Sequence, residues 1–215
     1  MLIRTIIIAL LALGGTAHAA CPTGADVEHG IVLTSKQDST YHHRTLDPEG
    51  TLVWQATGVY GSPPSRSDAS VWLYDHGLLT VRLGRRPVRK GVEAAMVATY
   101  DGTLAGLGPW SVGARLQLIG TRTRTDNDFR SRLIDTFEIL GSETIGIGAC
   151  DYNALIVRHA YQQVMPDGEL RQSATRKHWI PELRLIAQGS VYGNRSGYQT
   201  IRKREPGDWF DDNTN

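Results

Sequence analysis

The chain has 215 residues, of which 40% are hydrophobic and 21% are charged, and its 23 basic residues nearly balance its 22 acidic ones. A chain of this length supports one compact domain with a hydrophobic core. It lacks the basic excess typical of nucleic-acid-binding proteins and the basic amphipathic helix typical of membrane-surface proteins, so we expect neither kind of partner.

The first twenty residues have the pattern of an export leader. Arg4 precedes an apolar run from Ile6 to Leu13, and the small residues Ala17-His18-Ala19-Ala20 follow. The apolar run is too short to span a bilayer, and an Ala-x-Ala ending is typical of a cleavage site. We therefore predict a signal peptide over residues 1–20, a mature protein in the periplasm or outside the cell, and no transmembrane segment after cleavage.

The sequence contains two cysteines, Cys21 and Cys150. Export places them in an oxidising compartment, where thiols pair, so we predict a disulfide between them. It would close a loop of about 129 residues and stabilise the fold by roughly 5 kcal/mol on the chain-entropy model. The alternative is a lipid anchor on Cys21, but a lipoprotein signal has a leucine-like residue three positions earlier, where this chain has His18.

Short apolar segments of the mature chain have the period-two pattern of half-buried strands. In the segment from Leu133 to Ile139, Asp135 shares the inner face with Phe137 and Ile139. The strands predicted in this way are residues 51–56, 79–83, 113–119 and 133–139.

Turn sequences separate these strands and indicate antiparallel hairpins. The turns are expected at residues 47–50, 74–77, 101–102 and 166–168. We therefore predict a mostly β fold over residues 21–204, an antiparallel meander that forms a sandwich or an open half-barrel. Residues 205–215 are polar and acidic, and we expect a flexible tail there.

The segment from Asp151 to Met165 fits two structures. Its apolar residues fit one face of a helix capped by Asp151, but the β-branched pair Ile156-Val157 favours a strand. The turn at Asp167-Gly168 would then join this strand to residues 171–179 in a long hairpin. We favour the hairpin.

No motif of a known catalytic or metal site is present. A nucleophile elbow would require Gly-x-Ser-x-Gly, and residues 193–197 do not reproduce its spacing, so we expect a loop there. The histidines lack zinc-ligand spacing, and Asp126-Asn127-Asp128 lacks the glycine and distal glutamate of a calcium loop. We predict no catalytic residue, no metal and no cofactor.

One group of arginines suggests an anion-binding face. Arginines two positions apart on a strand point to the same side. Together with the arginines on the paired strand of the same hairpin, they would form a cationic surface for lipid phosphates or anionic glycans. The residues concerned are Arg122, Arg124, Arg130 and Arg132. The alternative, favoured by the balanced charge, is an ordinary solvent-exposed face.

The string His178-Trp179-Ile180-Pro181-Glu182-Leu183 resembles the aromatic-x-Pro-Glu-Leu strand entry of many uncharacterised secreted or periplasmic β-rich bacterial proteins. The resemblance covers roughly the last quarter of the chain. It implies a β-meander, and some of these proteins are half-barrels that resemble the lipoprotein carriers of the cell envelope, with a concave face for an acyl chain. It carries over no catalytic residue, because Pro181 fixes the chain direction while Trp179 and Leu183 bury.

Three functional hypotheses follow. We favour an exported, non-enzymatic binding or structural module for an amphipathic ligand or an envelope protein. One alternative is a lipid-carrier-like half-barrel. The other is a hydrolase or lyase on a cell-envelope glycan with an acid–base pair such as Asp135 and Glu138, although these residues would lie on opposite faces of one strand. An enzyme would bring Asp135, His159 and His178 into one pocket.

Overall fold

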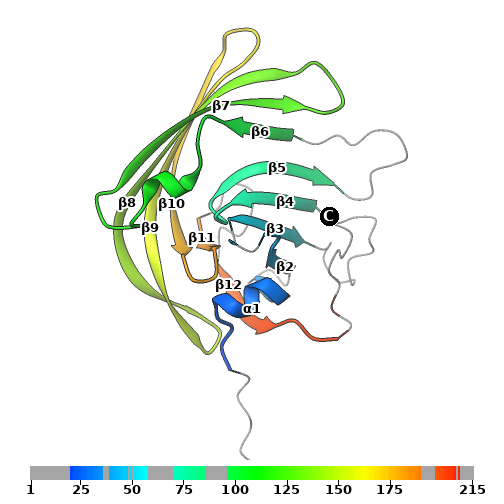
Figure 1. Ribbon diagram of the computed structural model, residues 1–215, viewed down its shortest axis with the longest axis vertical. Coiled ribbons are helices and arrows are strands. Elements are labelled where there is room, and N and C mark those ends of the chain that lie inside the picture. Colours follow the sequence, from blue (N-terminus) through cyan, green and yellow to red (C-terminus); the bar gives the residue numbers. More distant parts are fainter. Residues whose placement is uncertain are drawn as a thin grey trace, which may run out of the picture.

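The computed structural model describes residues 20–35, 39–47, 49, 51–57, 70–85, 96–189, 197–206 and 208. Residues 1–19 of the predicted signal peptide, 193–196 of the predicted loop, and 207 and 209–215 of the predicted tail lie outside the described residues. The described strands form one antiparallel sheet of 12 strands, in the order β11-β10-β9-β8-β7-β6-β5-β4-β3-β2-β1-β12. The sheet curls into an open half-barrel (Figure 1), which confirms the predicted fold class.

The helices and strands have the following bounds. They are α1 (Gly24–His29), β1 (Ile31–Ser35), β2 (Thr40–Thr45), β3 (Leu52–Thr57), β4 (Ser70–Asp75), β5 (Leu79–Arg85), β6 (Met96–Tyr100), η1 (Leu104–Leu107), β7 (Arg115–Arg124), β8 (Arg130–Ile147), β9 (Cys150–Val164), β10 (Leu170–Ile180), β11 (Leu185–Gln188) and β12 (Tyr198–Lys203).

The long strands β7 to β10 form one wall of the half-barrel and curve past the shorter strands β1 to β6 (Figure 1). On β8, Leu133, Asp135, Phe137 and Ile139 are all buried, as the period-two pattern predicts for one face. The segment after Asp151, which fits either a helix or a strand by sequence, forms strand β9. It pairs with β10 from Val164, opposite Leu170, to Leu155, opposite Trp179. The hairpin prediction is confirmed.

The two largest apolar clusters of the described residues lie in the interior. The first, which we call the disulfide core, joins α1, β1, β11 and β12 to the β8–β9 hairpin. Its buried members are Val27, Ile31, Leu33, Ile147, Cys150, Tyr152, Ala154, Ile180, Leu183, Leu185, Ala187 and Tyr198. The second, the inner core, lies on the concave face of the long strands. Its buried members are Leu78, Leu79, Leu104, Leu107, Leu118, Phe137, Val157, Trp179 and Ile186.

The chain start is fixed to the sheet by the predicted disulfide. Cys21 and Cys150 are bonded, with their Cα atoms 5.6 Å apart. The Tyr152 hydroxyl also donates to the Pro22 carbonyl at 3.0 Å. A sulfur in a disulfide is not free to carry a lipid thioether, so the structure favours the disulfide over the lipid anchor.

The β4–β5 turn ties the two walls together. The Trp179 indole N–H donates to the His76 carbonyl at 3.1 Å, and the Lys177 ammonium donates to the Leu78 carbonyl at 3.3 Å. Gly77 has φ +69°, and a Cβ there would lie 1.6 Å from the Arg184 carbonyl oxygen. Only glycine allows this approach, so the turn between β10 and β11 is held against the β4–β5 turn.

The first residues of the predicted tail contact the sheet. The Arg202 guanidinium donates two hydrogen bonds to the Asp208 carboxylate, at 2.6 and 2.7 Å. The Glu205 backbone N–H donates to the same carboxylate at 2.7 Å. The chain therefore remains bonded to β12 for five residues beyond the end of that strand.

Candidate ligand-binding site

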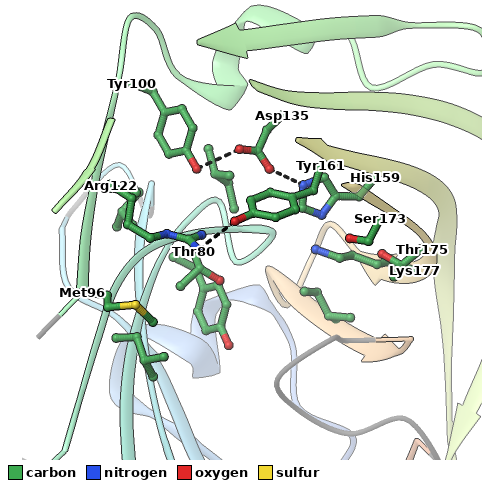
Figure 2. Close-up of a pocket in the computed structure, with 16 residues that line it drawn as sticks. Thr80, Met96, Tyr100, Arg122, Asp135, His159, Tyr161, Ser173, Thr175 and Lys177 are labelled. Atoms are coloured by element: carbon green, nitrogen blue, oxygen red, sulfur yellow. Dashed lines mark hydrogen bonds and ion pairs between the residues drawn. The ribbon is translucent and has the colours of Figure 1, made fainter. Parts of the chain in front are cut away.

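A cavity of about 90 Å³ lies inside the half-barrel, between β4–β6 and the long strands. Its two walls differ in chemistry. The apolar wall, on β5, β6 and β11, consists of Leu79, Val81, Leu83, Met96, Ala98 and Ile186. The polar wall, on β7 to β10, includes Arg122, Asp135, His159, Tyr161, Thr175 and Lys177. Figure 2 shows how the polar side chains converge.

Asp135 is the centre of the polar wall. Its side chain is almost fully buried, with 1% of the residue exposed, and it accepts two hydrogen bonds. The Tyr100 hydroxyl donates to Oδ2 at 3.0 Å, and His159 Nε2 lies 2.5 Å from Oδ1. Both carboxylate oxygens are therefore engaged (Figure 2). The prediction that Asp135 faces inward is confirmed. Its partner Tyr100 lies on β6 and its partner His159 lies on β9, so they reach Asp135 from opposite sides of β8.

A glycine allows Tyr100 to reach Asp135. Gly120 on β7 pairs with Tyr100 on β6, and Asp135 lies on the next strand, β8. A Cβ at Gly120 would lie 2.5 Å from the Thr99 carbonyl oxygen and 2.6 Å from a ring carbon of Tyr100. The phenol ring therefore crosses β7 over this glycine, in the space that any larger residue would fill.

His159 is held by stacking as well as by Asp135. Its ring stacks on Phe137, with centroids 4.4 Å apart and planes inclined by 9°. Burial lowers the pKa of His159, and the nearby Lys177 lowers it further, while Asp135 opposes both effects. The neutral imidazole that donates from Nε2 to Asp135 keeps a lone pair on Nδ1.

Two cationic side chains point toward one another from opposite sides of the cavity (Figure 2). The Arg122 guanidinium donates to the Tyr161 hydroxyl at 2.9 Å and lies 5.3 Å from the centroid of that ring. Lys177 is 6% exposed, and burial lowers its pKa to about 8 although Asp135 opposes the shift. Among the described residues, neither Arg122 nor Lys177 forms an ion pair with a carboxylate.

One hydroxyl on the polar wall has no hydrogen-bond partner among the described residues. Thr175 lies next to His159 in the β9–β10 register and lines the cavity. Its Oγ1 is buried, and within the described ranges no hydrogen bond reaches it. A buried polar atom without a partner is costly, so a ligand that bonds to it would be stabilised.

A second hollow adjoins the cavity. Strands β5 and β6 pair through Arg82–Val97 and Leu83–Met96. Beside this short pairing lies a hollow of about 310 Å³, which shares Leu79, Val81, Ala98 and Tyr100 with the cavity. These four residues therefore border both spaces.

The predicted cationic face is not formed as one surface. Arg122 pairs with Ser131 in the β7–β8 register, while Arg130 and Arg132 pair with Thr123 and Thr121. Neighbouring residues in register share a face, so Arg130 and Arg132 point away from the side that Arg122 occupies. Arg124 is exposed and forms an ion pair with Asp126 at 2.6 Å. Of the four arginines, Arg122 lines the cavity.

The carboxylates and histidines proposed for an enzyme are also divided. Glu138 lies outside the cavity with Arg158, 3.6 Å away, so it does not face the same bond as Asp135. His178 lies 3.0 Å from Glu143 and does not line the cavity. Asp135 and His159 do share it, which leaves a dyad of these two residues rather than the predicted acid–base pair.

The described part of the chain offers two further observations. It contains no group of three or more His, Cys, Asp or Glu side chains placed to hold a metal ion. None of its helices has the length and apolar character needed to cross a membrane.

Comparisons with known proteins found likeness in structure alone. No protein-family model matches the sequence, and no curated protein sequence matches it. The hypothetical lipoprotein YmcC of Escherichia coli aligns with a TM-score of 0.43 and 10% identity, over 83% of this chain and 84% of that one. A protein with a YmcC-like fold from Bacteroides fragilis aligns with a TM-score of 0.39 and 12% identity, over 81% of this chain and 94% of that one.

Proposed function

We propose that the protein is an exported, non-enzymatic binding module that holds a small amphipathic ligand inside its half-barrel. The observation that carries this proposal is the two-sided cavity. One wall is formed by aliphatic side chains of β5, β6 and β11, and the facing wall carries Arg122, Asp135, His159 and Lys177. An amphipathic molecule satisfies both walls at once.

The size of the site supports a ligand that extends beyond the cavity. A cavity of about 150 Å³ is enough for benzene, and the cavity here measures about 90 Å³. It therefore accommodates a polar group with a few carbon atoms. The adjoining hollow of about 310 Å³ has space for the rest of the molecule, next to Val81 and Ala98.

Two observations support export. The sequence begins with the pattern of a cleavable leader, and the two cysteines form a disulfide. Stable disulfides are typical of proteins that fold outside the reducing cytoplasm. We propose that the mature protein acts in the periplasm or outside the cell, and that its resemblance to secreted β-rich proteins in the last quarter of the chain reflects this shared location.

The binding proposal is tested by filling the cavity. Native mass spectrometry of the exported protein should show a bound small molecule, and the protein should enhance the fluorescence of Nile red, a neutral apolar dye. Ala98→Leu adds a branched side chain to the wall shared by both hollows and should reduce dye binding at least tenfold.

Gln162→Leu is the matched control. Gln162 is exposed on β9, between the interior residues Tyr161 and Gln163, so the same side chain is added to the opposite face. This variant should bind the dye as the parent protein does. A protein that carries no small molecule and leaves Nile red fluorescence unchanged would refute the binding proposal.

The hydrogen bond between Asp135 and His159 favours a second candidate, an acid–base enzyme. A carboxylate that orients an imidazole is a common arrangement for proton transfer. The two functions separate in one experiment, because a binding module releases its ligand unchanged. Recovery of a chemically altered ligand, prevented by His159→Gln, would support the enzyme in place of the binding module.

A further inference from the structure

The cavity holds more positive than negative charge. Two cations, Arg122 and Lys177, line it together with one carboxylate, Asp135. Asp135 directs its two oxygens to Tyr100 and His159, at 3.0 and 2.5 Å. The carboxylate is therefore occupied by other donors, and among the described lining residues no second carboxylate neutralises the cations.

The cations are also held in place by neutral partners. Arg122 donates to the Tyr161 hydroxyl at 2.9 Å, and Lys177 donates to the Leu78 carbonyl at 3.3 Å. The hydroxyl and the carbonyl orient the side chains without cancelling their charge. Both side chains line the cavity, and their charged ends approach from opposite sides (Figure 2), so the donors that Tyr161 and Leu78 do not use are available to a ligand.

We infer that the ligand is an amphipathic anion, a carboxylate or phosphate monoester on an aliphatic chain, whose charged group lies between Arg122 and Lys177. This inference rests on the proposed binding function and specifies its ligand. The hydroxyl of Thr175, which no other described residue contacts by a hydrogen bond, donates to the same anionic group. The chain of the ligand contacts Val81 and Ala98 and continues into the adjoining hollow.

Uncharged and anionic ligands should bind to this site with different affinities. A buried cation with no counter-ion is costly, and a bound anion removes that cost. A neutral alcohol of equal length gains the apolar contacts but leaves both cations uncompensated. A quaternary ammonium adds a third positive charge. The head group therefore decides affinity, while the chain contributes equally in all cases.

A series of ligands with one chain and four head groups tests the inference by isothermal titration calorimetry. The probes are decanoate, decyl phosphate, 1-decanol and decyltrimethylammonium. Decanoate or decyl phosphate should bind the unmodified protein about ten- to a hundredfold more tightly than decanol, as charge-assisted hydrogen bonds predict. The better of the two anions identifies whether the site prefers a planar or a tetrahedral head group.

Arg122→Gln should lower the affinity for the preferred anion about tenfold and leave decanol unaffected. Arg124→Gln is the matched control, because Arg124 lies two residues away on the same strand but is exposed and paired with Asp126. Lys177→Met should lower the affinity for the anion similarly. The head-group series uses the unmodified protein, so it decides the matter even where a variant does not fold.

The outcomes separate the two proposals. If neither the four probes nor Nile red bind, the binding function itself is wrong. If decanol or decyltrimethylammonium binds within threefold of both anions, the binding function stands and the inference of an anionic ligand is overturned. Equal anion affinities of Arg122→Gln and the unmodified protein would also overturn it.

Discussion

The two interior regions of this half-barrel follow opposite rules. The disulfide core is filled by apolar side chains such as Leu33 and Ile180, each with 0% exposure, and the bond from Cys21 to Cys150 closes it. The cavity region, on the same sheet, buries Asp135 and Lys177 around empty space. The same sheet thus fills one region with apolar side chains and places ionisable groups in the other.

The difference shows where stability and binding reside. Buried apolar contacts and a cross-link stabilise the disulfide core, whereas buried charges lower the stability of the cavity region. Such a division is typical of binding proteins, which retain costly groups only where a ligand offsets the cost. The following predictions test this division, from the largest expected effect to the smallest.

Removal of the disulfide should have the largest effect. The bridge joins residues 129 positions apart, and the chain-entropy model then gives a stabilisation of about 5 kcal/mol. The double variant Cys21→Ser, Cys150→Ser should lose free energy of unfolding up to this amount, measured by urea titration. If the variant folds in buffer without urea, it should still bind Nile red, because neither cysteine lines the cavity. An unchanged urea midpoint would show that the bridge does not constrain the fold.

Acid should weaken the protein through a buried histidine beside the disulfide core. His43 is 1% exposed, and its Nε2 lies 2.9 Å from the carbonyl of Leu183, a member of that core. Burial lowers the pKa of His43 to about 4, from 6.5 in an exposed chain, although the carbonyl opposes the shift. On acidification the unfolded chain binds the proton before the folded chain does. The free energy of unfolding therefore keeps its full value above pH 6.5 and falls by about 3 kcal/mol as the pH approaches 4.

His43→Gln removes this titration. Urea unfolding of both proteins between pH 7 and 4 should show that the stability of the unmodified protein falls by about 3 kcal/mol more than that of the variant. His42, which is buried on the same strand and whose pKa is also lowered to about 4, titrates in both proteins and cancels in the comparison. Parallel pH profiles would assign the acid sensitivity to other groups.

The disulfide core was more accessible to sequence reasoning than the cavity. Two cysteines in an exported chain leave one pairing, and Cys150 lies at the start of β9, next to the segment that the sequence assigns to a hairpin strand. Even within the cavity, the alternation of β8 correctly placed Asp135 with Phe137 on the inner face. These features depend on local pattern or on a count of residues, and both are visible in a single sequence.

The faces of the arginines follow from a pattern in the sequence. Leu116 and Leu118 place the even-numbered residues of β7 on the inner face, and Leu133 and Phe137 place the odd-numbered residues of β8 there. Arg122 therefore lies inside and Arg130 and Arg132 lie outside, in agreement with the pairing of Arg122 with Ser131. The partners of Asp135 are not contained in local pattern, since Tyr100 is 35 residues away and reaches it only because Gly120 lies between.

Lys177 had a signal that was not used. It lies two residues before Trp179, and the two share a face because side chains on a strand alternate. Trp179 was expected to be buried, so the same alternation places Lys177 inside the protein. A lysine on the buried face of a strand is rare and identifies a candidate site.

Lys177→Met should stabilise the protein in the absence of ligand, which is the sharpest test of the contrast between the two regions. Burial lowers the pKa of Lys177 from 10.5 to about 8, so the charged form costs about 3 kcal/mol below pH 8. Methionine has a similar length and no charge, and it forfeits about 1 kcal/mol from the bond to Leu78. The net gain at pH 7 should be about 2 kcal/mol in urea unfolding. Between pH 8 and 10.5 the native lysine is neutral while the unfolded one still binds a proton, so the unmodified protein gains stability and the advantage of the variant disappears. A variant that is less stable at pH 7 would mean that the bond from Lys177 to the β4–β5 turn outweighs the cost of burying its charge.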